Sequence, residues 1–430
     1  MPKSPFSCFH NANPDLPPHQ VDFTVGWQSP SNIALIKYWG KRAGQLPINP
    51  SLSMTLGVAV TQTSVHVSAH QDTKGLVSVN GDPFHPFLPK MRALLQQLDA
   101  EIPFLPNLTF TARTRNHFPH STGIASSASG LSAFALCILE AALKISSPEL
   151  FENEPFNPGR PQPAALQREM QNAKSEIRNA KPETQNAKPE TQNAKGEMRN
   201  AKSETPLLDG LQHMASYAAR LGSGSACRSL YGGFTAWGMT NLIEGSSDDW
   251  ALPLSEKIHP EMLSVHDAIL VVSARPKELS SSQGHAAMTG HPFVEGRIGQ
   301  ANRNFGAALE ALSSNDFEKL GAVAECEALT LHALLMSACP GTILMLPATV
   351  EIMHRVRAAR KSGLPLFFTL DAGANVHVLY PHASAWQVEK FITANLQPLC
   401  EEGRVIFDAC GAGPVAMEPP VLTLKSYEKE

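Results

Sequence analysis

The most constraining feature of this sequence is a long stretch in which nearly every position is small or apolar. It covers residues 126–145 and reads SSASGLSAFALCILEAALKI. A helix without a polar face is a buried helix, so the stretch predicts a helix inside a large hydrophobic core. The chain has 430 residues, 43% of them hydrophobic and 17% charged. That composition excludes a wholly disordered polymer and allows two or three globular domains.

Charge and cysteine usage exclude several classes of protein. The 35 basic and 39 acidic residues give a net charge of −4, so nothing draws the chain generally to nucleic acid or to an anionic membrane. We find no apolar run that approaches the ~18–20 residues needed to cross a bilayer, and no secretory signal at the N-terminus. The seven cysteines are scattered without C-x-x-C, and the sixteen histidines lack H-E-x-x-H. We therefore expect a cytoplasmic protein with reduced thiols, no metal site of its own, and no nucleic-acid or membrane partner.

A seven-residue repeat interrupts the globular pattern. Residues 172–205 read NAKSEIR, NAKPETQ, NAKPETQ, NAKGEMR and NAKSET. A coiled coil needs two apolar positions per heptad, and this repeat offers little beyond Ala, while Pro182 and Pro189 would interrupt a helix. We interpret residues 155–205 as a mobile insertion in a surface connection, with a docking or spacer element as the alternative.

Strand and helix patterns are mixed along the rest of the chain. Alternating residues predict strands at 61–70, 108–116, 266–274, 364–370, 375–381 and 403–409. Helical patterns cover 91–100, 207–222, 303–312 and 317–336. Because strands and helices do not alternate strictly, we predict an α+β fold in two domains rather than a doubly wound parallel sheet. The proline-rich residues 1–20 read as a flexible tail.

The first of four motif clusters lies between a predicted strand and the buried helix. It reads PHSTGIASSA at 119–128. Small residues let the backbone approach a ligand closely, and the start of the helix presents N–H groups and a positive dipole end. This pattern predicts a phosphate cradle, although it is not a Walker A loop. The alternative is that Ser126 and Ser127 only cap the helix.

Two further clusters combine cations with aromatic or small residues. Residues 31–42 (SNIALIKYWGKR) place three cations beside Tyr38 and Trp39, which indicates an anion site with aromatic walls. Residues 222–233 (GSGSACRSLYGG) place Arg228 after a glycine-rich turn with two serines, an arrangement that suits a phosphate or a carboxylate. The alternatives are a solvated basic turn and a flexible loop with an exposed arginine.

The fourth cluster is an acidic residue at the end of a strand. Asp371 follows the apolar strand FFTL and opens the turn DAGAN. A carboxylate in this position is either reactive or the cap of a turn, and the local sequence leaves both open.

Taken together and in this order, the clusters resemble the GHMP kinase superfamily and, within it, the diphosphomevalonate decarboxylase family. The matching segments are NIALIKYWGKR, PINPSLSMTL, NHFPHSTGIASSASG, GSGSACRSLYGGF and FTLDAGANVHVLYP, and the likeness spans residues 23–415 apart from the insertion. It implies the two-domain GHMP kinase fold. A ribosomal-protein-S5-like N-terminal domain would cover 21–262, and a ferredoxin-like C-terminal domain would cover 263–430.

The resemblance also implies a reaction. It is the ATP- and Mg²⁺-dependent conversion of (R)-5-diphosphomevalonate to isopentenyl diphosphate, with release of ADP, phosphate and carbon dioxide. His285 in place of a methionine, Ala374 in place of a proline, and the unusual His120-Ser121-Thr122 bear on the choice of substrate. Mevalonate 5-phosphate or a 3-phosphorylated mevalonate, a GHMP kinase that stops after phosphorylation, and a non-catalytic regulator with this fold are the alternatives. Family members are often homodimers, so we expect one here.

By matching position, the resemblance assigns three catalytic roles. Asp371 would orient or deprotonate the C3 hydroxyl, Lys37 would stabilise developing charge beside it, and Arg228 would bind the C1 carboxylate. Mg²⁺ would be held mainly by the ATP phosphates, with Ser127 as a candidate ligand. The implied substrate-binding residues are Tyr38, Trp39, Gly40, Lys41, Ser223, Gly224, Ser225, Ala226, Cys227 and Ser281, and the implied ATP-binding residues are Gly123, Ile124, Ala125, Ser126 and Ser127.

Overall fold

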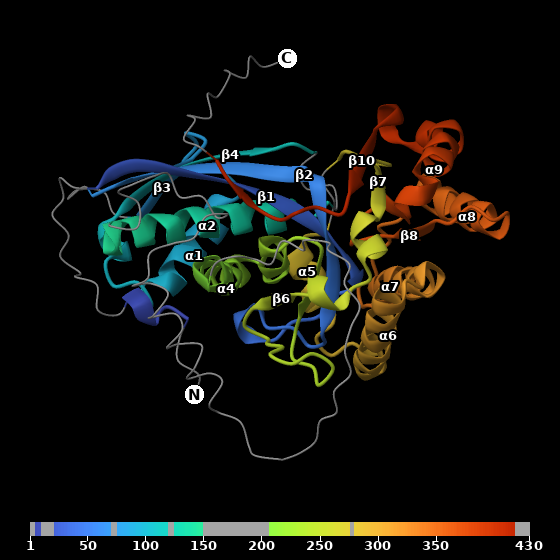
Figure 1. The fold of residues 1–430 in the computed structure, drawn as a ribbon, viewed down its shortest axis with the longest axis horizontal. Helices are drawn as coiled ribbons and strands as arrows, with labels where there is room; N and C mark the ends of the chain where they lie inside the picture. Colours follow the sequence, from blue (N-terminus) through green and yellow to red (C-terminus); the bar gives the residue numbers. More distant parts are fainter. Residues whose placement is uncertain are drawn as a thin grey trace, which may run out of the picture.

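The computed structural model describes residues 5–9, 21–69, 75–118, 124–148, 206–275 and 279–417 (Figure 1). The predicted insertion at 155–205 lies outside these residues. The fold is α+β, as the mixed patterns predicted, and it is built on two sheets.

The first sheet has seven strands and is organised around two long ones. β1 (Asp22–Ile36) and β2 (Ser51–Ser68) pair antiparallel along most of their length, in the sheet order β11-β1-β2-β4-β3. β5 pairs with β2 beside β6. The remaining strands are β3 (Gly75–Val79), β4 (Thr109–Asn116), β5 (Phe234–Trp237), β6 (Ala251–Pro253) and β11 (Val415–Ala416).

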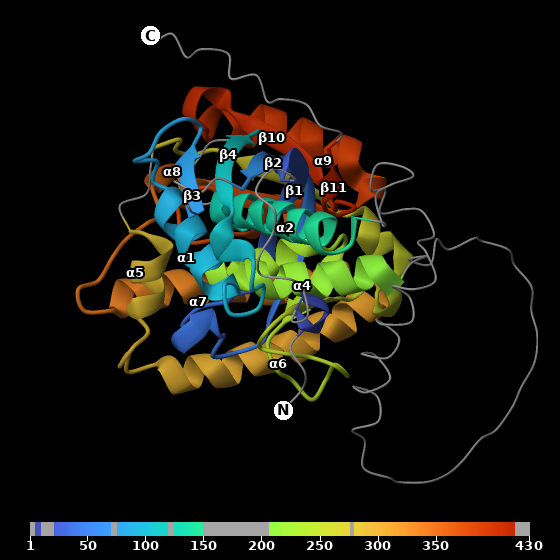
Figure 2. The same cartoon turned by 90° about the vertical axis from the view of Figure 1, so that its left-hand side faces the viewer.

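The predicted buried helix is α2 (Ser126–Ser146), and it lies against one face of this sheet (Figure 2). α4 (Pro206–Gly222) packs on α2, and α1 (Leu88–Leu98) packs on α4. Small hydroxyls let α2 approach the sheet closely, because Ser132 Oγ lies 2.6 Å from Ser29 Oγ and Ser129 Oγ lies 2.6 Å from Thr61 Oγ1. These hydrogen bonds satisfy polar groups that the core would otherwise bury at a cost.

The expectation that no segment reaches membrane-spanning length is wrong on length and composition. α2 has a mean hydropathy of 1.6 and α7 (Phe317–Ser337) one of 1.3, which suffices for a span by that criterion alone. The reason is their position in the fold, since 89% of the apolar window of α2 and 56% of that of α7 is buried inside the protein. A core helix needs the same residues as a membrane helix.

The second sheet has four antiparallel strands in the order β10-β7-β9-β8. Figure 1 shows it beside the first sheet, with helices packed around it. α7 and α8 contact β8, and α6 packs along α7. The bounds are β7 (His266–Leu270), β8 (Phe367–Thr369), β9 (Val376–Tyr380), β10 (Val405–Ala409), α5 (Ser281–Ala286), α6 (Val294–Ser314), α8 (Pro347–Lys361) and α9 (Ala385–Phe391).

The two sheets are joined by polar and apolar contacts. Asp408 on β10 accepts backbone N–H groups of Gly57, Val58 and Ala59 on β2 at 2.7, 2.8 and 2.7 Å. α6 and α7 contact β1, and one hydrophobic cluster includes residues of both parts. The chain finally returns through β11 to pair with β1. This joint fixes the second sheet and its helices against the end of β1.

The interpretation of residues 1–20 as a flexible tail is wrong for Pro5 to Phe9. Phe6 and Phe9 are fully buried. They pack with ring centroids 5.5 Å from Tyr217 and 6.4 Å from Phe104. A short 3₁₀ turn at Ser7–Phe9 brings the two rings, three residues apart, to one side of the chain. The rest of the predicted tail lies outside the described residues.

Candidate active site

A cavity of about 680 Å³ is lined by residues of the first sheet and by helices and a turn that belong to the second part of the fold. That volume is within the range of small-molecule sites. Residues from the end of β1, α1, the start of α2, α5 and the turn after β8 line it. Among the residues predicted from sequence, the lining includes Lys37, Tyr38, Trp39, Lys41, Ala125, Ser126, Ser127, Ser223, Gly224, Ser225, Arg228 and Asp371.

An ion pair between Lys37 and Asp371 is part of the cavity lining. Lys37 directly follows β1 and Asp371 follows β8, and the distance from Nζ to Oδ1 is 2.9 Å. Burial lowers the pKa of Lys37, and the carboxylate of Asp371 opposes this shift. Burial alone would raise the pKa of Asp371, but the charge and hydrogen bond of Lys37, together with the charges of His377 and Arg228, bring that pKa below its ordinary value. The 2.9 Å contact and the lowered pKa of Asp371 are those of an ion pair between a carboxylate and an ammonium.

His332 of α7 holds the main chain of Asp371. Its Nε2 lies 3.1 Å from the Asp371 carbonyl oxygen. Burial lowers the pKa of His332 to about 4, so the ring is neutral at pH 7 and donates its Nε2–H to that carbonyl. The turn that carries the catalytic candidate is thus anchored from the helix beneath it.

Arg228 is a buried guanidinium beside the same cavity. It lies on a 3₁₀ segment, Gly224–Leu230, and only 2% of it is exposed. Its Nη1 donates to Ser51 Oγ at 2.6 Å, and Nε and Nη2 lie 3.4 Å from Asn32 Oδ1. Among the described residues no carboxylate forms an ion pair with Arg228. A buried charge without a counter-ion is unfavourable, so an anion in the cavity would complete this site.

Two further ammonium groups line the cavity. Lys41 Nζ donates to Gln45 Oε1 at 2.9 Å, and Lys90 projects from the first turn of α1. Burial lowers the pKa of Lys90, and the charge of Lys41 lowers it further. Two cations that repel each other in one cavity indicate a place for a multiply charged anion.

The aromatic wall predicted from residues 31–42 is present. The Tyr38 ring lies 4.6 Å from Trp237 and 4.3 Å from His285 between centroids. His285 also accepts the N–H of Gly40 at its Nδ1, at 3.1 Å. Gly40 has φ +87°, and a Cβ there would lie 2.3 Å from Ile48 Cδ1, so only glycine fits this turn.

The first turn of α2, which packs on the first sheet, forms part of the cavity wall. Ala125, in the left-handed region at φ 42°, occupies the N-cap position, and no side chain caps the helix there. The alternative in which Ser126 and Ser127 are only caps is therefore wrong, because both lie inside the first turn. That turn presents the positive end of the helix dipole to the cavity. Gly123 and the preceding residues 119–122 lie outside the described residues.

Comparison with known proteins places these features in a family. Residues 29–153 and 198–248 match the diphosphomevalonate decarboxylase-like N-terminal domain, and residues 268–415 match the mevalonate 5-diphosphate decarboxylase C-terminal domain. The chain belongs to the diphosphomevalonate decarboxylase family. Curated members include the enzyme of Ganoderma lucidum, 28% identical over 410 residues (90% of this chain and 85% of that one). The enzyme of Candida albicans is 26% identical over 420 residues (91% and 97%).

Solved structures that bear the decarboxylase name share the fold. The mevalonate diphosphate decarboxylase of Staphylococcus aureus superposes with a TM-score of 0.66 at 22% identity, covering 94% of this chain and all of that one. A structure titled "MDDEF in complex with MVAPP, AMPPCP and Magnesium" gives a TM-score of 0.64 at 24% identity, with 93% and 100% covered. The fold predicted from the decarboxylase signatures is thus confirmed, and the domain bounds of 21–262 and 263–430 stay predictions.

Some residues that the decarboxylase resemblance implied do not line the cavity. Cys227 is buried beneath it with Sγ 3.0 Å from the Gly224 carbonyl oxygen, and burial raises its thiol pKa to about 12. Ile124 packs in the core. Gly40 and Ala226 shape the backbone beside the cavity without lining it, and the side chain of Ser281 lies outside what is described.

Sequence reasoning in turn missed several lining residues. Lys90 belongs to no motif, and the only indication was its place in an amphipathic helix near the N-terminal strands. His285 was noted only as a departure from the decarboxylase pattern. Other lining residues not predicted are Asn32, Gln45, Phe87, Ser282, Gln283 and Leu331.

Proposed function

We propose that the protein converts (R)-5-diphosphomevalonate to isopentenyl diphosphate in a reaction that consumes ATP and requires Mg²⁺. The observation that carries this proposal is the convergence of the Asp371 carboxylate, the Lys37 ammonium and the Arg228 guanidinium on one cavity. The three come from segments far apart in the chain, and Asp371 follows Lys37 by 334 positions. Family membership supports the same conclusion, since the curated relatives bear the name of this activity.

The first step is transfer of a phosphoryl group to the C3 hydroxyl. The ionised carboxylate of Asp371 orients that hydroxyl and accepts its proton as the oxygen forms its bond to the γ-phosphorus and ADP leaves. Lys37 keeps Asp371 ionised before transfer and stabilises negative charge during it. Phosphorylation turns the tertiary hydroxyl into a good leaving group.

The second step forms the alkene. The C3–O bond breaks and phosphate leaves, and the electrons of the C1–C2 bond become the second bond between C2 and C3 as carbon dioxide departs. Arg228 binds the C1 carboxylate and holds the C1–C2 bond in the orientation that this elimination needs. Because the guanidinium is itself buried, bulk water does not screen its attraction to the carboxylate.

The cavity has suitable groups for nucleotide and metal. The first turn of α2, with Ser126 and Ser127, would receive the ATP phosphates, and Lys90 would neutralise further phosphate charge, while Lys41 would face the diphosphate of the substrate. Mg²⁺ supplies charge neutralisation on the phosphates. The ATP phosphates would be its main ligands, with Ser127 in the first turn of α2 as a protein candidate.

The position of Arg228 favours decarboxylation over the kinase alternative. A kinase that stops after phosphorylation has no need of a buried guanidinium for a carboxylate. Incubation with ATP, Mg²⁺ and, in turn, 5-diphosphomevalonate, 5-phosphomevalonate and 3-phosphorylated mevalonate tests this, with ADP and carbon dioxide followed together. We expect equal amounts of both from the diphosphate. ADP alone would establish the kinase, and silence with every substrate would establish the regulator.

The position of Lys41 in the cavity leads to a prediction about the affinity for the substrate. Because Lys41 faces the cavity and is only partly shielded from water, Lys41→Met should raise the KM for 5-diphosphomevalonate about tenfold, with kcat nearly unchanged. Arg42→Met is the matched control, since Arg42 pairs with Asp248 outside the cavity. Steady-state kinetics of both variants, which give KM and kcat separately, test this prediction. Equal KM values for the two variants would show that Lys41 does not contact the substrate.

Two further expectations, a homodimer and a cytoplasmic location, stay predictions from sequence. Sedimentation of the purified protein at micromolar concentration is the direct check of the first.

A further inference from the structure

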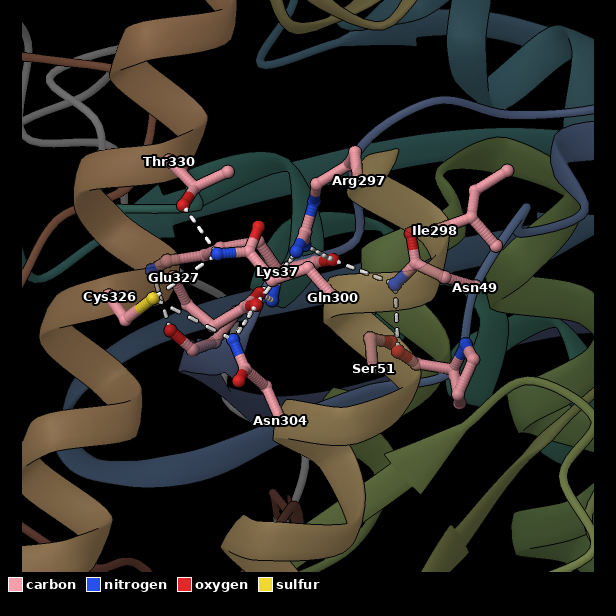
Figure 3. Close-up of polar contacts among 12 residues, drawn as sticks. Lys37, Asn49, Ser51, Arg297, Ile298, Gln300, Asn304, Cys326, Glu327 and Thr330 are labelled. Carbon is pink, nitrogen blue, oxygen red and sulfur yellow. Dashed lines mark hydrogen bonds and ion pairs between the residues drawn. The ribbon is translucent and has the colours of Figure 1, made fainter. Parts of the chain in front are cut away.

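Two buried charged side chains outside the cavity meet behind Lys37 (Figure 3). Arg297 comes from α6 and Glu327 from α7, and their side chains are 1% and 0% exposed. Arg297 Nη1 donates to Glu327 Oε1 and Nη2 to Oε2, both at 2.7 Å. This two-pronged geometry is the strongest that an arginine and a carboxylate form.

Both members of the pair also bind the main chain of Lys37. The Lys37 N–H donates to Glu327 Oε2 at 2.9 Å, and Arg297 Nη2 donates to the Lys37 carbonyl oxygen at 3.1 Å. Asn49 Nδ2 donates to the same oxygen at 3.1 Å. The β1–β2 ladder ends at the pair Ile36 and Leu52, so the sheet offers Lys37 no partners. The ion pair supplies the donor and the acceptor that this buried peptide needs.

Helix packing alone does not explain a buried pair here. Taking two charges out of water is costly, and apolar side chains of similar volume often hold two helices equally well. Glu327 is nevertheless fully engaged, since Asn304 Nδ2 also donates to its Oε1 at 2.8 Å. Apolar side chains could not form the hydrogen bonds that the ion pair makes to the N–H and the carbonyl oxygen of Lys37.

We propose that Arg297 and Glu327 are positioning residues for Lys37, which fix its backbone so that its ammonium reaches Asp371. On the side-chain end, Lys37 Nζ donates to the Ala34 carbonyl oxygen at 2.6 Å and to Asp371 Oδ1 at 2.9 Å. Arg297 and Glu327 lie on the helices beside the second sheet. Their contacts with Lys37 therefore link the position of that part of the fold to the position of the Lys37 ammonium. The kinetic part of the inference rests on the proposed function, because it assumes that Lys37 acts in that reaction.

Glu327 acts on Lys37 electrostatically as well. Burial is the largest influence on the pKa of Lys37 and lowers it. The charges of Asp371 and, to a smaller extent, Glu327 raise that pKa, and the charge of Arg228 lowers it. His332 is the other titratable side chain coupled to this ammonium, and its ring is neutral at pH 7. Removing the charge of Glu327 should therefore lower the pKa of Lys37, and a lysine needed in its protonated form would lose activity at a lower pH.

The first test removes the ion pair of Arg297 and Glu327 and keeps the packing between α6 and α7. In the double variant Arg297→Met with Glu327→Met, we expect a melting temperature close to that of the parent and a kcat about 10- to 100-fold lower, because small displacements of a reacting group have effects of that size. The KM values for ATP and substrate should stay nearly unchanged. Glu325→Gln is the control on the same helix, since Glu325 pairs with Arg357 and Arg360 of α8 and should leave kcat unaltered. A folded double variant with the parental kcat overturns the inference.

The second test does not depend on turnover. In protein with isotopically labelled lysine, the side-chain resonance of Lys37 is assigned by its loss in Lys37→Arg and titrated with pH. We expect its midpoint at lower pH in Glu327→Gln, because the charge of Glu327 raises the pKa of Lys37, and unchanged in Glu325→Gln. If the parental protein releases no carbon dioxide, the proposed function is refuted, but this titration still tests the inference. An unshifted midpoint in Glu327→Gln overturns it.

Discussion

Asp371→Asn should lower kcat for ADP and carbon dioxide together by about 10³-fold, because an amide cannot accept the proton of the C3 hydroxyl. The substitution preserves the shape of the side chain and removes only its charge. Affinity for ATP should remain nearly that of the parent, since the nucleotide would bind at the first turn of α2. Product release is measured by simultaneous ADP and carbon dioxide assays, and nucleotide affinity by titration calorimetry.

Asp316→Asn provides the matched control for this prediction. Asp316 accepts the N–H of Lys319 at 2.9 Å as the cap of α7, remote from the cavity, and asparagine caps helices about as well as aspartate. That variant should therefore turn over normally. Parental kcat in Asp371→Asn would show that another group receives the proton.

Arg228→Met should separate the two halves of the reaction. The guanidinium is buried and bonded to Ser51 and Asn32, so its loss leaves the C1 carboxylate of the substrate without a counter-charge. Truncating a buried charge pair of this kind costs about 2–5 kcal/mol, and we expect kcat/KM for carbon dioxide release to fall about 10³-fold. Phosphoryl transfer depends on Asp371 and Lys37 instead. ADP should consequently form in excess over carbon dioxide.

Arg220→Met tests whether the loss of any buried arginine would do the same. Arg220 is equally buried but bonds to Asp249 and to the Gly44 carbonyl oxygen, and it does not line the cavity. Its removal should lower stability and leave one carbon dioxide for each ADP. If Arg228→Met kept that ratio and lost less than about tenfold in kcat/KM, the assignment to the carboxylate would fail.

Local periodicity predicted the elements that have one strong pattern. The alternation at 61–70 overlaps β2 as far as Ser68, and the unbroken apolar run is α2. α8 was not identified, because its charged residues hide a narrow buried stripe of Thr349, Ile352, Met353 and Val356. Phe6 and Phe9 were assigned to a tail because the prolines around them indicate irregular chain, and burial there depends on partners distant in sequence.

The site shows the same division between local and long-range information. The segments of Lys37, Arg228 and Asp371 were found because each carries a motif, but only the resemblance to a family placed them together. Lys90, Arg297 and Glu327 carry no motif, and their roles come from neighbours that the fold brings to them. From sequence alone, a charged residue on a helix is expected to be exposed to solvent, and only the tertiary structure shows what it contacts.

The most direct test of the account follows the oxygen atom at C3. With 5-diphosphomevalonate carrying ¹⁸O in its C3 hydroxyl, ATP and Mg²⁺, the label is traced by mass spectrometry of the released phosphate. If the cavity phosphorylates that hydroxyl and then expels it, every inorganic phosphate carries one ¹⁸O and appears with one ADP and one carbon dioxide. Unlabelled phosphate, or label left in the organic product, would contradict the central claim.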